Sequence, residues 1–250
     1  MDSPPARFKK EGKNMNKIII ADKTIVESTS NTSYSMNFKE KMEVAKRLEK
    51  IKVNVIEMPA ATEQTDALMI KSLASMLKES VISVAAGPNK AEIDAAYNTI
   101  KNACKPRIRI CVPTSSVQME FILGAKPAKI IENVPELIAY AKTLCNDVEL
   151  SCIDASRSEI DFVAKLVEGA VNSGATVIDF CDIAGVFLPE DTSSFINEIK
   201  ERVPAIKNVT ISMTSSDELR MGNANAVAAI KAGATQIKTS LVGRSTPKTG

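Results

Sequence analysis

The feature that most constrains the fold is a regular alternation of short apolar runs with helical periods, which begins at Lys17. The segment after the first run, for example, has a helix start of the capping-box type at Asn37 and Glu40. The runs are nearly continuous in β-branched and apolar residues, which is typical of strands covered on both faces in a parallel sheet. Eight such runs are found, at residues 17–22, 53–59, 81–87, 107–113, 147–154, 176–182, 209–214 and 236–242.

Eight strands with seven intervening helices predict an α/β fold, a (β/α)8 barrel, in which functional groups lie at the C-terminal ends of the strands. Gly174 and Gly233 each stand where a helix ends before the next strand, so we expect left-handed turns there. We expect one barrel domain over residues 17–250 and a disordered leader over residues 1–16. Only a short segment follows the last run, so we expect the barrel to lack its final helix. The outer face of strands 1 and 8 is then covered either by neighbouring helices and the leader or by a partner chain, and the sequence leaves both open.

The composition is typical of a soluble globular protein, with 44% hydrophobic and 25% charged residues and a net charge of +2. There is no basic stripe with stacking aromatic residues, so we expect no nucleic-acid partner. No apolar run is long enough to span a membrane, and no signal peptide precedes the first run. The five cysteines lack metal-binding spacing and are expected to be reduced core thiols, which indicates a cytoplasmic protein.

The predicted strand ends carry hydroxyl, amide, carboxylate and basic side chains but no histidine, because the chain contains none. Without imidazole, a tight zinc, iron or cobalt site is not expected, whereas an all-oxygen magnesium or manganese site and a merely solvated acidic rim both stay open. The rim candidates are Asp22, Lys23, Glu27, Glu57, Gln118, Asp154, Ser156, Arg157, Asp182, Thr214, Ser216, Asp217, Glu218 and Asn225.

Three segments carry a resemblance to a known family: "DKTIVES" from Asp22, "DASRSEIDFVAKLVEGAVNSGATVIDFCDIAGVFLPED" from Asp154, and "NANAVAAIKAGATQI" from Asn223. They resemble the pyruvate-carboxyltransferase-like barrels, which include isopropylmalate synthase, homocitrate synthase and hydroxymethylglutaryl-CoA lyase. The resemblance covers essentially residues 17–250. It implies a divalent metal that polarises a 2-oxo acid while acetyl-CoA is enolised and condensed onto it, which is the chemistry that a Claisen step needs.

The resemblance weakens at the family's catalytic positions. The first-strand motif Asp-Thr-Thr-Leu-Arg-Asp-Gly is here Asp22-Lys-Thr-Ile-Val-Glu-Ser28, so Val26 replaces the substrate-binding arginine and Glu27 replaces the metal-binding aspartate. The His-x-His metal ligands align with Thr214 and Ser216. The fourth ligand, Asn225, is retained. Because a hydroxyl is a poor substitute for imidazole, the chain alone is expected to bind the family's metal weakly or not at all.

The same departures continue on strands 5 and 6, where Ile153 replaces a glutamate and Ile183 replaces a threonine that the family carries. Gln118 follows strand 4 in a pattern that is similar to homocitrate synthases of the nitrogen-fixation type. With the degenerate metal site, this resemblance implies the omega-type subunit of a split homocitrate synthase. Its expected partner is a catalytic alpha-type subunit, and that subunit holds the divalent metal. Acetyl-CoA and the 2-oxo acid bind in the complex, and this chain alone needs no cofactor.

Two other hypotheses are open from the sequence. An independent, metal-free aldolase or lyase would use Lys23 or Lys238 as a Schiff-base amine, against the simpler interpretation of Lys23 as a rim charge and Lys238 as an outward-facing strand residue. A regulatory barrel that only binds a ligand would hold a carboxylate with Ser156 and Arg157. In that case Asp154 is the alternative, purely structural partner of Arg157.

Overall fold

All eight predicted strands form, and they close into a parallel barrel in chain order from β1 to β8, with β8 returning to β1. The computed structural model describes residues 17–30 and 35–241. Each strand lies within one of the predicted runs or differs from it by one or two residues. The strands are β1 (Ile19–Asp22), β2 (Val55–Met58), β3 (Val81–Ala86), β4 (Pro106–Pro113), β5 (Val148–Ile153), β6 (Val177–Asp182), β7 (Thr210–Ser215) and β8 (Gln236–Thr239).

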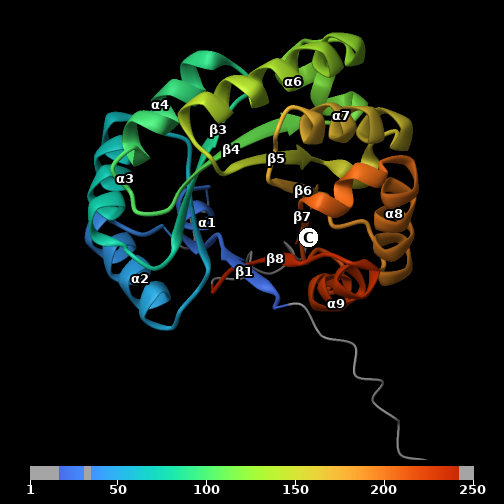
Figure 1. Cartoon of the computed structure of the whole chain (residues 1–250). Coiled ribbons are helices and arrows are strands. Elements are labelled where there is room, and N and C mark those ends of the chain that lie inside the picture. Colours follow the sequence, from blue (N-terminus) through green and yellow to red (C-terminus); the bar gives the residue numbers. More distant parts are fainter. Residues whose placement is uncertain (1–16, 31–34, 242–250) are drawn as a thin grey trace, which may run out of the picture.

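Helices surround this barrel as an outer ring (Figure 1). Their apolar faces pack on the strands, as where Phe195 of the helix after β6 meets Phe180 edge to face at 5.2 Å. The main helices are α2 (Phe38–Lys50), α3 (Gln64–Met76), α4 (Lys90–Ile100), α6 (Pro127–Leu144), α7 (Ile160–Asn172), α8 (Pro189–Arg202) and α9 (Gly222–Ala232). Short helical elements lie in the connections: α1 (Thr24–Ser30), α5 (Ser116–Gln118), η2 (Met119–Leu123), η3 (Ala155–Arg157) and η4 (Pro204–Asn208).

The local signals seen in the sequence act as expected. Asn37 and Glu40 form the predicted capping box at the start of α2, each side chain accepting a hydrogen bond from the other residue's backbone N–H. Gly174 and Gly233 have φ values of 99° and 113°, a conformation that costs glycine little because it has no Cβ. These turns bring the chain from α7 and α9 directly into β6 and β8.

Several expectations lie at the limits of the described chain. The predicted leader, residues 1–16, and the segment where a final helix is expected to be missing, residues 242–250, lie outside the described residues. On the side formed by β1, Ile18, Ile19 and Ile20 are only half-buried, whereas Ile237 on β8 is buried. Within the ranges that are described, no helix combines the length and apolar character needed to cross a bilayer.

Candidate functional site

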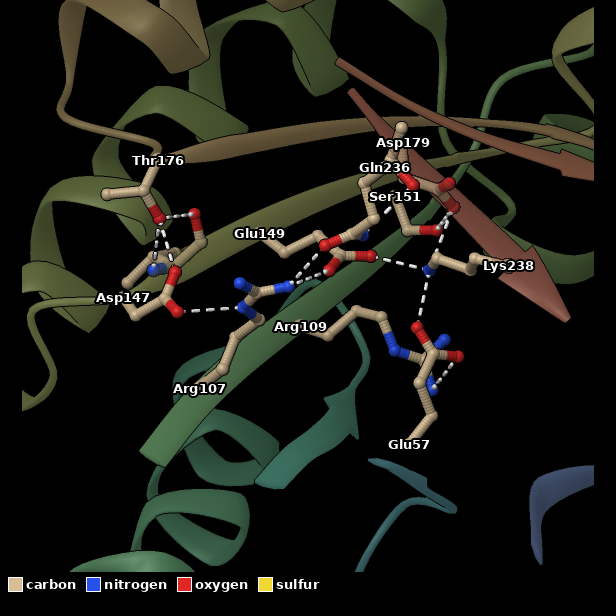
Figure 2. Close-up of polar contacts among 12 residues, drawn as sticks. Glu57, Arg107, Arg109, Asp147, Glu149, Ser151, Thr176, Asp179, Gln236 and Lys238 are labelled. Carbon is tan, nitrogen blue, oxygen red and sulfur yellow. Dashed lines mark hydrogen bonds and ion pairs between the residues drawn. The ribbon is translucent and has the colours of Figure 1, made fainter. Parts of the chain in front are cut away.

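The inside of the barrel holds ionised side chains where barrels of this type usually stack branched aliphatic ones. Lys238 on β8 points inward, and its Nζ lies 2.7 Å from Glu57 Oε1, 2.6 Å from Glu149 Oε1 and 3.0 Å from Asp179 Oδ2. Figure 2 shows this ammonium group at the meeting point of β2, β5, β6 and β8. Every one of these side chains is at most 2% exposed, so the three carboxylates face a buried cation of the protein and are shielded from water.

Two arginines of β4 complete the group. Arg109 Nη2 lies 3.5 Å from Glu57 Oε2, and Arg107 Nη1 lies 3.3 Å from Glu149 Oε2 and donates to Gln236 Oε1 at 3.0 Å. We call these six charged residues the interior ion cluster: Glu57, Arg107, Arg109, Glu149, Asp179 and Lys238. Its three cations balance its three carboxylates, which is why the cluster is tolerated in a buried position.

The electrostatics of the cluster fix the charge of its lysine. Burial by itself lowers the pKa of Lys238, but the surrounding carboxylates outweigh burial and hold this pKa well above its ordinary value. Burial likewise raises the pKa of Asp179, yet Lys238 and the hydrogen bonds from Cys181 and Ser151 bring it below the usual range. Lys238 is therefore an ammonium ion at neutral pH, without the lone pair that a Schiff base requires.

The sequence-based interpretation of Lys238 as an outward-facing residue is wrong. The physical reason is the β-strand repeat of two residues, which sends Gln236 and Lys238 to the same inner face, and Arg107 and Arg109 likewise on β4. Sequence reasoning also missed Arg107, Arg109, Glu149 and Asp179 as parts of a polar interior. The available signal was ionisable residues at alternate positions within otherwise apolar strands.

A cavity of about 300 Å³ lies above this cluster at the C-terminal ends of β1, β7 and β8. We call it the rim cavity. Glu27 and Ser216, two of the positions aligned with the family's metal ligands, line it together with Lys23. The Glu27 carboxylate lies 2.8 Å from Lys23 Nζ, one helical turn away, so its charge is already compensated.

The other two positions aligned with the family's metal ligands serve different partners. Thr214 donates its hydroxyl hydrogen to Asp179, at 3.1 Å from both carboxylate oxygens, and so belongs to the surroundings of the interior ion cluster. Asn225 donates from Nδ2 to the carbonyl oxygen of Phe187 at 2.7 Å, which ties α9 to the connection between β6 and α8. Asn225 Oδ1 is buried and has no hydrogen-bond partner among the described residues.

The residues predicted after strand 5 form a compact group of their own. Arg157 makes a two-pronged contact with the buried carboxylate of Asp154, at 2.9 Å from Nε and 2.7 Å from Nη2. Ser156 donates to Asp182 Oδ1 at 2.5 Å, and Asp182 also accepts from the backbone N–H of Phe187. The contact shown is therefore the structural pairing of Arg157 with Asp154, which was the alternative to a role in holding a ligand.

Three predicted rim residues stand apart from the rim cavity. Asp22, at the end of β1, accepts from Thr24 N–H at 2.9 Å, and burial raises the pKa of this carboxyl group. Glu57 lies below the rim, inside the interior ion cluster. Gln118 lies on α5, where its backbone N–H donates to Ser115 Oγ at 3.4 Å, on the side of the rim formed by β4.

These positions do not fit the family's divalent metal. Glu27 is paired with Lys23, the Thr214 hydroxyl is engaged by Asp179, and the Asn225 amide is bonded through Nδ2 to the Phe187 carbonyl oxygen. Over residues 17–30 and 35–241, no group of three or more cysteine, aspartate or glutamate side chains is placed to hold a metal ion.

Comparison with known proteins agrees with this architecture. The chain is 36% identical over 230 residues to 2-isopropylmalate synthase of Halalkalibacterium halodurans, covering 92% of this chain and 45% of that protein. It is 39% identical over 231 residues to the enzyme of the same name from Campylobacter hominis, with the same coverage. The chain thus spans less than half the length of these curated relatives.

Two solved structures share the fold. Hydroxymethylglutaryl-CoA lyase from Pseudomonas aeruginosa superposes with a TM-score of 0.76 at 13% identity, covering 90% of this chain and 76% of that one. The N-terminal domain of a putative aldolase from Bacteroides vulgatus gives a TM-score of 0.69 at 17% identity, covering 91% and 74%. The model of the HMGL-like family matches residues 17–245, which include all the described residues. This protein belongs to the HMGL-like family.

Proposed function

We propose that this chain is the subunit of a homocitrate synthase that does not itself hold the metal. Its partner is a second family member, an alpha-type chain with the His-x-His pair intact. The complex condenses acetyl-CoA with 2-oxoglutarate, an acyltransferase reaction, and the homocitrate supports synthesis of the iron-molybdenum cofactor in nitrogen fixation. The curated relatives are 2-isopropylmalate synthases, so condensation on a 2-oxo acid is the broader class to which this proposal belongs.

The proposal depends mainly on one observation: side chains at the positions of the family's metal ligands are bonded to other side chains of the protein. Thr214 is bonded to Asp179, whose charge is balanced by Lys238, and Glu27 is bonded to Lys23. The side chains at these metal-ligand positions are thus bound to other side chains of the protein. A chain that keeps the family barrel with such a site is suited to supporting a catalytic chain. The choice of 2-oxoglutarate depends on the resemblance at Gln118, and the five free cysteines favour a cytoplasmic setting.

The geometry does not favour the metal-free alternative. Lys238 is held as an ammonium ion by three carboxylates, so it cannot add to a carbonyl, and Lys23 is engaged by Glu27. A barrel that only binds a ligand would have to separate Arg157 from Asp154 first. The subunit assignment requires neither change.

The proposal is tested on the purified chain with two measurements. Manganese titration followed by electron paramagnetic resonance is expected to show no saturable site, because hydroxyls stand where the family has its imidazole ligands. Release of free CoA from acetyl-CoA is expected to be absent with 2-oxoglutarate and with the branched 2-oxo acid that yields 2-isopropylmalate. Tight manganese binding together with turnover of either acid by this chain alone would refute the proposal.

A further inference from the structure

A second cavity, of about 630 Å³, opens at the opposite end of the barrel from the rim cavity, at the N-terminal ends of β1 to β4. Its volume falls within the range of roughly 300–1,000 Å³ that is usual for sites of small ligands. We call it the basic pocket. It is lined by Lys17, Ile19, Lys52, Val53, Asn54, Val55, Glu79, Val81, Lys105 and Arg107.

The pocket concentrates positive charge. Three lysines, Arg107 and a single carboxylate line it; because Asp147 and Glu149 already compensate Arg107, the lysines leave an excess of two positive charges, on a chain whose whole net charge is +2. The carboxylate, Glu79, lies 3.8 Å from Lys105 and is mostly exposed, so it compensates that lysine only weakly. Lys17 and Lys52 are exposed at the mouth of the pocket. Such a concentration attracts a multiply charged anion.

The floor of the pocket is a buried arginine with donors to spare. Arg107 is only 5% exposed, and Asp147, Glu149 and Gln236 hold its Nε and Nη1. Its Nη2 donates no hydrogen bond within the described chain. Unlike Nε of Arg109, this atom is not among the fully buried side-chain atoms that lack a hydrogen-bond partner. Figure 2 shows Arg107 clamped on two sides by Asp147 and Glu149, which fixes the direction of its remaining N–H groups.

The backbone beside the pocket also adopts an unfavourable conformation. Lys52 follows the end of α2 with a φ of 63°, at the position where helices usually place glycine. Asn54 Oδ1 accepts from Ile20 N–H at 3.0 Å, so a side chain bridges β1 and β2 where the pocket separates them. A lysine in a left-handed conformation that favours glycine, beside a cavity, is the kind of local strain that accompanies binding sites.

We propose that the basic pocket binds a small phosphate-bearing molecule. A phosphate group carries up to two negative charges and three acceptor oxygens, so two linked phosphates match the lysines at the mouth and the Arg107 donors at the floor. The pocket lies at the other end of the barrel from the rim, so its ligand is separate from the acids condensed in the proposed reaction. The proposal stands or falls independently of that function.

The test is isothermal titration of the full chain with inorganic pyrophosphate and, separately, with citrate. Pyrophosphate is expected to bind at one site and more tightly than citrate. Lys52→Gly and Lys105→Gln should each weaken pyrophosphate binding by about tenfold, the loss of one charge-assisted hydrogen bond. Lys165→Gln, which removes an exposed lysine from α7, should leave the affinity unchanged.

The Lys52→Gly variant guards against misfolding as an explanation, because glycine relieves the left-handed backbone and should keep or raise the unfolding temperature. Absence of saturable pyrophosphate binding would overturn the proposal. Equal binding by all the variants, which indicates a general attraction to the protein surface, would overturn it as well. Citrate binding as tight as pyrophosphate binding would overturn the assignment to phosphate.

Discussion

Replacing Lys238 with methionine tests whether the interior ion cluster is held together as the structure implies. Methionine keeps the length of the side chain and fits an apolar surrounding, so the main change is the loss of one buried positive charge. In the native chain three cations face three carboxylates. In the variant two arginines face three carboxylates, so one carboxylate must take up a proton for the barrel to stay folded.

The size of the effect follows from that proton. At pH 7, protonating a carboxyl group with an ordinary pKa near 4.3 costs about 3.7 kcal/mol, within the range for breaking a buried ion pair. At pH 5 the same step costs about 1 kcal/mol. The folded variant binds one proton more than its unfolded state, so its stability falls by about 1.4 kcal/mol for each pH unit between these values. In the native chain, folding raises the pKa of Lys238, so the contribution of its charge to stability is lost only as the pH rises above the pKa of the unfolded state. That range lies outside the window from pH 5 to pH 7.

The assay is urea unfolding at pH 7 and pH 5, followed by circular dichroism, for the native chain, Lys238→Met and Lys231→Met. Lys231 is exposed on α9, so its replacement should change the free energy of unfolding by no more than about 0.5 kcal/mol. The deficit of Lys238→Met should be about 2.7 kcal/mol larger at pH 7 than at pH 5. An equal deficit at both pH values, or none at all, would show that Lys238 does not neutralise the buried carboxylates.

Three further predictions concern the rim and the thiols. Asn225→Ala should lower the free energy of unfolding by about 1–3 kcal/mol in urea because Phe187 loses a buried partner, and an unchanged value would contradict this anchoring role. Gly185→Ala should cost about 1–2 kcal/mol or more, since φ is 64° and a Cβ would lie 2.9 Å from Glu218; a neutral effect would contradict the turn geometry. Cys104, the exposed thiol, should react first with a maleimide under native conditions, and faster labelling of any other cysteine, read by mass spectrometry, would contradict the burial pattern.

The sequence predicted the barrel well because each unit carries its own local signals. The capping box at Asn37 and the left-handed glycines at 174 and 233 mark where helices begin and end, and β-branched runs mark the strands. Such signals depend on only a few neighbouring residues. They therefore predict the same helix and strand ends wherever both faces of the sheet are packed. The order and closure of the strands then follow from the right-handed connections of parallel units.

The polar interior was not predicted, because it arises from contacts between strands that are far apart in the sequence. Lys238 meets Glu57 and Glu149 only once the barrel has closed, and the alternation of ionisable residues within each strand does not tell which of them will pair. The candidate site was predicted in part. Glu27 and Ser216 do line one cavity, but Thr214 is turned to Asp179. That hydrogen bond depends on the neighbouring strand β6 and on its register with β7.

Reconstitution with the proposed partner measures whether this chain supports catalysis in another chain. Purified alpha-type subunit with an intact His-x-His pair is assayed for CoA release from acetyl-CoA and 2-oxoglutarate, alone and with increasing amounts of this chain. We expect no activity from this chain alone and a saturable increase when the two are mixed, with 2-oxoglutarate preferred over the branched 2-oxo acid. Full activity of the alpha-type subunit alone, unchanged on adding this chain, would contradict it.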